Sequence, residues 1–142
     1  FPDTDVVEMD TVKGTRTAGK CVLTLLFRKS SFMLIILLPG ALRKLKKRKG
    51  KVRTHVYYCN PYMSNQKGRI EKNHEYIRYV IPKGKTMQNF TQEDMCKLAS
   101  HINSTARDSL NGRTPFDLAE LLLDKRIPAL SGLYKVSETT SF

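Results

Sequence analysis

Acidic residues are missing from a long interval of this sequence. Residues 11–70 contain no Asp or Glu but 15 Lys or Arg, whereas the rest of the chain carries 10 basic and 13 acidic side chains. Positive charge held on one segment favours a polyanion, because each phosphate that it neutralises releases condensed counterions. The alternative is that these cations simply solvate a surface. Their placement on one half of the chain favours nucleic acid as the partner.

The sequence also has few features of secreted or membrane proteins. Its longest apolar run, Phe32 to Leu38, is far shorter than the roughly 20 residues that span a bilayer as a helix. The three cysteines include no C-x-x-C pair, so neither a disulfide framework nor a zinc site is indicated. No signal-like order of basic, apolar and small residues occurs near the start. We therefore expect a cytoplasmic protein with no membrane partner.

The first part of the chain has strand composition. Three segments bounded by turn residues predict an antiparallel meander: Asp5–Val12, Cys21–Phe27 and Phe32–Leu38. Positions 34–38 are all apolar, which is typical of a central strand covered on both faces. A basic, low-complexity stretch covers residues 41–52, and strand composition returns at Thr54–Tyr58.

The second half has helical periodicity. Apolar residues recur at helical spacing from Ile70 to Ile77, and Pro82 predicts the end of that helix. A capping-box pattern at Thr91 begins a second helix, and Thr114 followed by proline opens a third. In the third helix we expect three inward-facing leucines: Leu118, Leu121 and Leu122. Strands followed by helices predict one domain over residues 1–142, of α+β or mixed α/β class.

Two acidic residues occupy unusual settings. Strand alternation places Glu8 and Asp10 on one face, and a carboxylate in mid-strand is costly unless it is paired or binds a cation. Glu71 is a lone acid near a helix start, among three basic residues: Lys67, Arg69 and Lys72. From this segment alone, an exposed edge strand with two solvated acids is the favoured interpretation of Glu8 and Asp10. Glu71 could be a surface ion-pair partner or a complement to the helix dipole.

Several ordered blocks together resemble one protein family. They are Glu8-Met-Asp-Thr-Val-Lys-Gly14, His55-Val-Tyr-Tyr-Cys-Asn-Pro-Tyr62, Gln66-Lys-Gly-Arg-Ile-Glu-Lys-Asn-His74, Ile81-Pro-Lys-Gly84 and Leu110-Asn-Gly-Arg-Thr-Pro-Phe116. Spread over residues 5 to about 135, they resemble the DDE-type catalytic core of RNase H-like transposases of insertion-sequence group thirty. That group is a branch of the retroviral-integrase superfamily.

The resemblance implies DNA cleavage and strand transfer, the reactions of DNA transposition and integration. In the family two divalent cations, Mg²⁺ or Mn²⁺, are held by two Asp and one Glu. Asp10 matches the first of these ligands and Glu71 the last. The implied partners are DNA at element ends and targets, further copies of the chain or an intact transposase, near the bacterial nucleoid. We expect DNA-gripping cations beside Glu71, unless they only solvate a helix face: Lys67, Arg69, Lys72, Lys83 and Lys85.

The second catalytic Asp of the family is missing, because its expected interval holds no acidic residue. We infer an internal deletion near residues 39–53 that removes part of the central sheet and its helices. We also expect a DNA-reading helical domain to have preceded Phe1. With two carboxylates the metal affinity should fall, so we expect weak or absent strand transfer; Glu8 or Glu75 could substitute as a ligand. The alternative is a non-catalytic remnant that binds DNA or inhibits intact transposase.

Overall fold

A computed structural model describes residues 6–15, 19–40 and 68–137. Three strands come first: β1 (Val7–Lys13), β2 (Cys21–Phe27) and β3 (Phe32–Leu38). Within residues 68–137 the structure has four α-helices and one 3-10 helix: α1 (Gly68–Val80), α2 (Gln92–Asn103), η2 (Asp108–Leu110), α3 (Pro115–Leu122) and α4 (Arg126–Leu130). The predicted meander and the mixed α/β class are confirmed. The predicted strand at residues 54–58 and the inferred deletion lie outside, or mostly outside, the described residues.

The three strands form an antiparallel sheet in the order β1-β2-β3. In its register Asp10 lies opposite Thr24, and Thr24 lies opposite Ile35. The central strand of the described sheet is therefore β2, and the prediction that positions 34–38 form a central strand was wrong. β3 lies at an edge, and its residues Leu34, Ile36 and Leu38 are only half-buried.

Two side-chain amides of α2 take the place of a neighbouring strand along β3. Asn103 accepts a hydrogen bond from Met33 N and donates one to Met33 O, both at 2.8 Å. Gln92 accepts from Leu37 N at 2.7 Å and donates to Ile35 O at 3.0 Å. An all-apolar strand can therefore lie at an edge, because the helix satisfies backbone groups that would otherwise pair with another chain.

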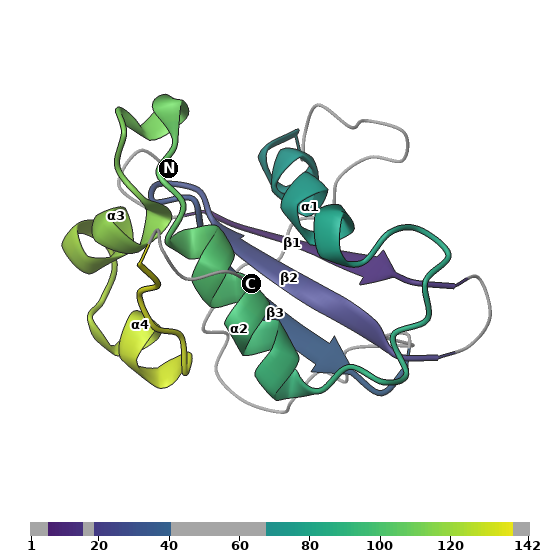
Figure 1. Ribbon diagram of the computed structural model, residues 1–142. Coiled ribbons are helices and arrows are strands. Elements are labelled where there is room, and N and C mark those ends of the chain that lie inside the picture. The colour runs from purple at the N-terminus through teal and green to yellow at the C-terminus, as the bar shows by residue number, and fades with distance from the viewer. Residues whose placement is uncertain (1–5, 16–18, 41–67, 138–142) are drawn as a thin grey trace.

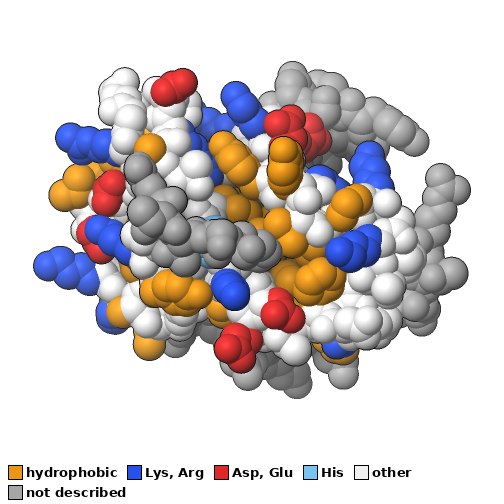
Figure 2. Space-filling model, viewed as in Figure 1, with side chains coloured by type: hydrophobic (Ala, Val, Ile, Leu, Met, Phe, Trp, Pro, Cys, Tyr) orange, Lys and Arg blue, Asp and Glu red, His pale blue; other side chains and the backbone are white. Residues whose placement is uncertain are grey.

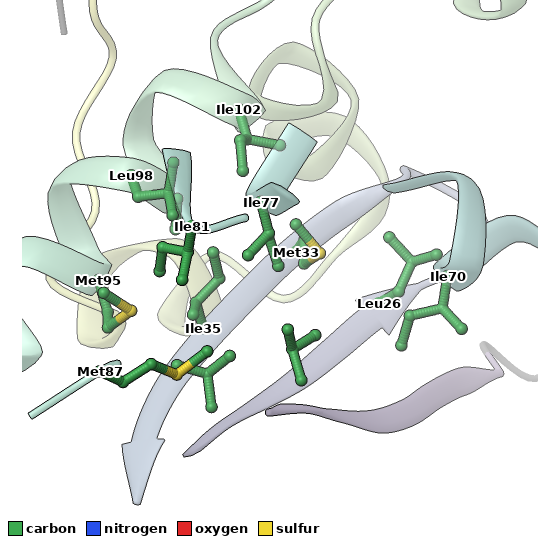
Figure 3. Packing of buried hydrophobic residues seen from close by; sticks show 13 residues of the cluster. Leu26, Met33, Ile35, Ile70, Ile77, Ile81, Met87, Met95, Leu98 and Ile102 are labelled. Carbon is green, nitrogen blue, oxygen red and sulfur yellow. The ribbon is translucent and has the colours of Figure 1, made fainter. Parts of the chain in front are cut away.

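The main core lies between the sheet and the helices α1 and α2, which cover the same face (Figure 1). Strand alternation directs Val22 and Leu26 of β2 into this core, and both are fully buried. The helices contribute residues at three- and four-residue spacing, as predicted. Figure 3 shows the residues that the helices contribute to the cluster: Ile70, Ile77, Met95, Leu98 and Ile102. Ile81, directly after α1, and Met87, in the segment between the helices, join them.

A second, smaller core joins α3 to β3. Phe116 packs edge-to-face on Phe32, with ring centroids 5.3 Å apart and an interplanar angle of 84°. Ala119 is buried here and Leu123 packs against the cluster, so the inward stripe is 116, 119 and 123. The expectation of inward-facing leucines at 121 and 122 was wrong, since these side chains are 68% and 54% exposed. The aromatic pair sets the rotation of this short helix.

The predicted helix starts are confirmed. Thr91 and Asp94 form a reciprocal capping box on α2, and Thr114 and Asp117 form another on α3, where Pro115 is the first helical residue. Each box satisfies backbone N–H groups that the helix cannot satisfy itself. Of the helices described, none has the length and apolar character needed to cross a membrane.

Candidate functional site

Glu8 ties the first strand to the start of α1. Its side chain is only 5% exposed. One carboxylate oxygen accepts a hydrogen bond from Arg28 Nε at 2.6 Å, and the other accepts from Ile70 N at 3.0 Å. Ile70 lies in the first turn of α1, where backbone N–H groups need acceptors. Because the fold engages both oxygens, this arrangement argues against Glu8 as a substitute metal ligand.

Asp10 lies on the face of β1 that α1 covers, as strand alternation from Glu8 requires. The residue is half-buried, and its Oδ1 accepts from Thr11 N at 2.8 Å. On the opposite strand, the hydroxyl of Thr24 donates to the Asp10 carbonyl at 3.1 Å and lies 2.7 Å from His74 Nε2. This contact ties α1 to the strand pair at the level of Asp10.

Glu71 lies between the two points where α1 is tied to the sheet. It follows Ile70 in the first turn and precedes His74 by three residues. Its side chain is exposed, and a negative charge in the first turn complements the helix dipole. Glu71 lines an open depression of about 500 Å³ with other residues of α1 and the turn after it: His74, Glu75, Arg78, Tyr79 and Lys83. We call this hollow the α1 depression.

The two contacts to α1 bring Asp10 and Glu71 to the same side of the sheet. Carboxylates are suitable ligands for Mg²⁺ or Mn²⁺, but these ions prefer several oxygen ligands. In residues 6–15, 19–40 and 68–137, no three His, Cys, Asp or Glu side chains lie close enough together to hold a metal ion. The side chains that the structure describes therefore do not by themselves fit a two-metal centre.

Two of the predicted DNA-binding cations lie on α1, near Glu71. Arg69 and Lys72 are both exposed. Arg69 Nη1 donates to the carbonyl of Arg28 at 2.9 Å, so its guanidinium lies close to the Glu8 contact. Lys67, the third cation predicted beside Glu71, lies outside the described residues.

The other two predicted cations, Lys83 and Lys85, lie on a turn that is held against the end of β1. Gly84 N donates to Gly14 O at 2.7 Å. A Cβ atom at Gly14 would lie 2.1 Å from Lys85 O, so only glycine allows this close approach. Lys83 borders the α1 depression, whereas Lys85 Nζ lies 5.7 Å from the ring centroid of Phe90. The motifs contained both glycines, but the sequence did not predict that they meet.

Arg107 is a half-buried cation that no sequence pattern singled out. It joins α1 to the end of α2, because its Nη1 donates to Asn73 Oδ1 at 2.7 Å and its Nη2 to Ile102 O at 3.4 Å. The guanidinium also lies 4.8 Å from the ring centroid of Tyr76. Burial lowers its pKa, with a smaller opposing effect from Tyr76. No periodicity or motif distinguishes this arginine from the surface cations.

The chain is similar to transposases of several insertion sequences. It is 32% identical over 68 residues to the transposase for insertion sequence element IS1086 of Cupriavidus metallidurans, covering 47% of this chain and 20% of that protein. It is 31% identical over 65 residues to transposase InsI for element IS30A of Escherichia coli, covering 46% and 17%. It is 27% identical over 81 residues to the transposase for element IS4351 of Bacteroides fragilis, covering 57% and 25%.

These similarities cover about half of the chain, and the chain spans a quarter or less of the length of each relative. The matched part of this chain is shorter than residues 5 to about 135, the span over which the motifs resemble the family. No protein-family model matches the sequence, and no solved structure matches it. The similarity to insertion-sequence transposases is thus confirmed, while the DDE core and the internal deletion stay predictions.

Proposed function

We propose that this chain is part of a transposase catalytic core that binds DNA but lacks one catalytic carboxylate and does not carry out strand transfer. The observation that carries the proposal is its similarity to three insertion-sequence transposases. The contacts of Glu8 and His74 support it, because they bring Asp10 and Glu71 to one side of the sheet.

In this proposal Asp10 and Glu71 are what remains of a ligand set for Mg²⁺ or Mn²⁺. Such ions would activate water or a 3′ hydroxyl and stabilise the leaving oxygen. The interval 11–70 offers no third carboxylate, and no group of three candidate ligands is found among the described residues. Two carboxylates in a basic setting compensate little of the charge on two divalent ions, so the affinity for metal should be low. Loss of strand transfer follows from this deficit.

DNA binding does not need the missing carboxylate. Three of the predicted cations are exposed: Lys83 lines the α1 depression, Lys72 is next to Glu71 on α1, and Lys85 lies two residues after Lys83. The first half of the chain adds an uninterrupted excess of positive charge, which attracts phosphates over a long range. In this proposal the chain acts near the nucleoid, on DNA, with other copies or an intact transposase as its partners.

The test is a nicking and strand-transfer assay on supercoiled and element-end DNA with Mg²⁺ or Mn²⁺. It compares the natural sequence with Asp10→Asn, Glu71→Gln and the matched control Glu93→Gln, an exposed glutamate in the first turn of α2 that lies outside the α1 depression. We expect all four proteins to bind DNA and none to cleave it. Metal-dependent cleavage that both site variants lose and the control retains would contradict the proposal, since some other group would then replace the missing Asp.

A second candidate function is inhibition of an intact transposase. It is favoured by the same combination of excess positive charge with an incomplete ligand set. Adding the chain to an active insertion-sequence transposase should then lower strand transfer, and Asp10→Asn should inhibit as well as the natural sequence. Inhibition that depends on Asp10 would indicate competition for metal instead.

A further inference from the structure

Tyr79 is the most exposed large hydrophobic side chain in the described part of the protein, at 93%. Single exposed aromatic residues are common on protein surfaces and need no explanation by themselves. Tyr79 differs because it lines the α1 depression. Helical spacing places it on the same side of α1 as Glu71 and Glu75, each four residues apart. The ring therefore borders the same hollow as Glu71.

Charge is divided along this depression. Glu71 lies in the first turn of α1 and Glu75 one turn later, whereas Arg78 lies in the last turn and Lys83 just beyond it. In the space-filling view, acidic side chains gather at the upper end of α1, and basic ones lie on either side of them (Figure 2). A phosphate is repelled from the first end and attracted to the second. Tyr79 lies at the attractive end.

The cations beside Tyr79 are held in place by the fold. Arg78 Nη1 donates to Lys13 O at 3.1 Å and to Ile81 O at 3.5 Å. Lys83 lies on the turn that Gly84 anchors to the end of β1. A phosphate that binds here finds the Arg78 guanidinium already positioned and the backbone of Lys83 anchored, so less ordering is required on binding.

We propose that the α1 depression binds one unpaired nucleotide of a DNA strand, with its base stacked on Tyr79 and its phosphate beside Arg78 and Lys83. Stacking on an exposed aromatic ring requires a base whose face is free, which a single strand offers and the interior of a duplex does not. The inference rests on the proposed function, because that proposal makes DNA the ligand. It adds the form of DNA that is bound and the side chain that selects it.

The test measures binding of the full chain to a short dye-labelled oligothymidine and to a blunt duplex of the same length, by fluorescence anisotropy in EDTA. Tyr79→Ala should weaken single-strand binding about tenfold, because stacking contributes on the order of 1–3 kcal/mol per base. Duplex binding should change less than about twofold. Tyr79→Phe keeps the ring and should bind as the natural sequence does. The matched control is Tyr134→Ala, a tyrosine that is 51% exposed and lies outside the depression.

Lys83→Ala should weaken both forms of DNA and reduce the dependence of binding on salt. Unchanged single-strand binding in Tyr79→Ala, an equal loss in Tyr134→Ala, or no rescue by phenylalanine would each overturn the inference. Tighter, Tyr79-dependent binding of oligouridine would reassign the site to RNA and overturn it as stated. Because EDTA excludes metal chemistry, the outcome is independent of cleavage. If neither DNA form binds, the proposed function fails as well; if DNA binds regardless of Tyr79, only this inference fails.

Discussion

The helices α1 and α2 pack on the same face of the sheet, and both use polar side chains to contact it. On α2 the amides of Gln92 and Asn103 bind the backbone of β3. On α1 His74 contacts Thr24 of β2, but the side chains of Glu71, Glu75 and Tyr79 are exposed. The comparison indicates that both helices serve the fold, whereas α1 also keeps groups available for a ligand.

The two helices also begin differently. α2 starts with its own capping box, which uses only Thr91 and Asp94. The first turn of α1 is bound by Glu8, a residue 62 positions earlier in the sequence. A local cap forms with the helix itself, whereas the start of α1 is placed only when the sheet has formed. The position of the proposed site therefore depends on a tertiary contact.

The largest effect is expected from Asn103→Ala in α2. Asn103 is fully buried and satisfies both backbone groups of Met33, and an unsatisfied buried group costs about 1–3 kcal/mol. We expect the free energy of unfolding to fall by about 3 kcal/mol, measured by urea titration with circular dichroism. A loss below about 1 kcal/mol would show that α2 is not needed to close the edge of β3.

The next largest effect is expected from Glu8→Ala, which removes the contact that places α1. It leaves the buried Ile70 N–H and the partly exposed Arg28 without this acceptor, and should lower the free energy of unfolding by about 2 kcal/mol. Glu8→Gln should lose less, since its amide oxygen still accepts. The control is Glu71→Gln on the exposed side of α1, which should change stability by less than about 0.5 kcal/mol. Equal losses of unfolding free energy in Glu8→Ala and Glu71→Gln would contradict the prediction that Glu8, but not Glu71, stabilises the fold.

A smaller effect is expected from Gln92→Ala. This amide makes two bonds to β3 like Asn103, but its residue is exposed, so water can replace the lost partner. We expect a loss of about 1 kcal/mol in the same urea titration. If Gln92→Ala lowers the free energy of unfolding as much as Asn103→Ala does, burial does not determine how much each amide contributes to stability.

The smallest effect is expected in the pH dependence of the α2 cap. Hydrogen bonds from the Thr91 backbone N–H and then from its hydroxyl lower the pKa of Asp94 from its usual 3.8. The folded state therefore binds this proton more weakly than the unfolded state, and the stabilisation is present above pH 3.8 and lost as the pH falls through the folded pKa. Asp94→Asn should have a lower thermal midpoint than the natural sequence at pH 7, and the two should converge in acid. A constant difference across this range would contradict the assignment; Asp117, whose pKa is also lowered, affects both proteins alike.

Sequence patterns predicted the bounds of strands and helices better than they predicted which elements pack against one another. The bounds of β2 and β3 and the starts of α2 and α3 follow from short apolar runs and capping boxes, which are local signals. The position of β3 was wrong because an all-apolar run looks the same in a central strand and in an edge strand closed by Gln92 and Asn103. The leucines of α3 were misplaced because contact with Phe32, far away in the sequence, sets the rotation of that helix.

The residues of the candidate site also divide into those that sequence motifs identified and those that only the structure identified. Asp10 and Glu71 were identified from motifs, and the structure brings them to one side of the sheet without testing their roles. The structural role of Glu8 and the exposure of Tyr79 had no local signal. They depend on which side of a strand or helix the rest of the fold covers.

By itself, the sequence determined the strands, the helix caps, the one-sided distribution of charge and the absence of acidic residues between positions 11 and 70. Each of these is a property of neighbouring residues. The tertiary structure alone decided that Glu8 binds the start of α1, that Thr24 meets His74 across 50 residues, and that Gly14 holds the turn at Gly84. Such contacts form only when packing has brought distant segments together, so no local pattern specifies them.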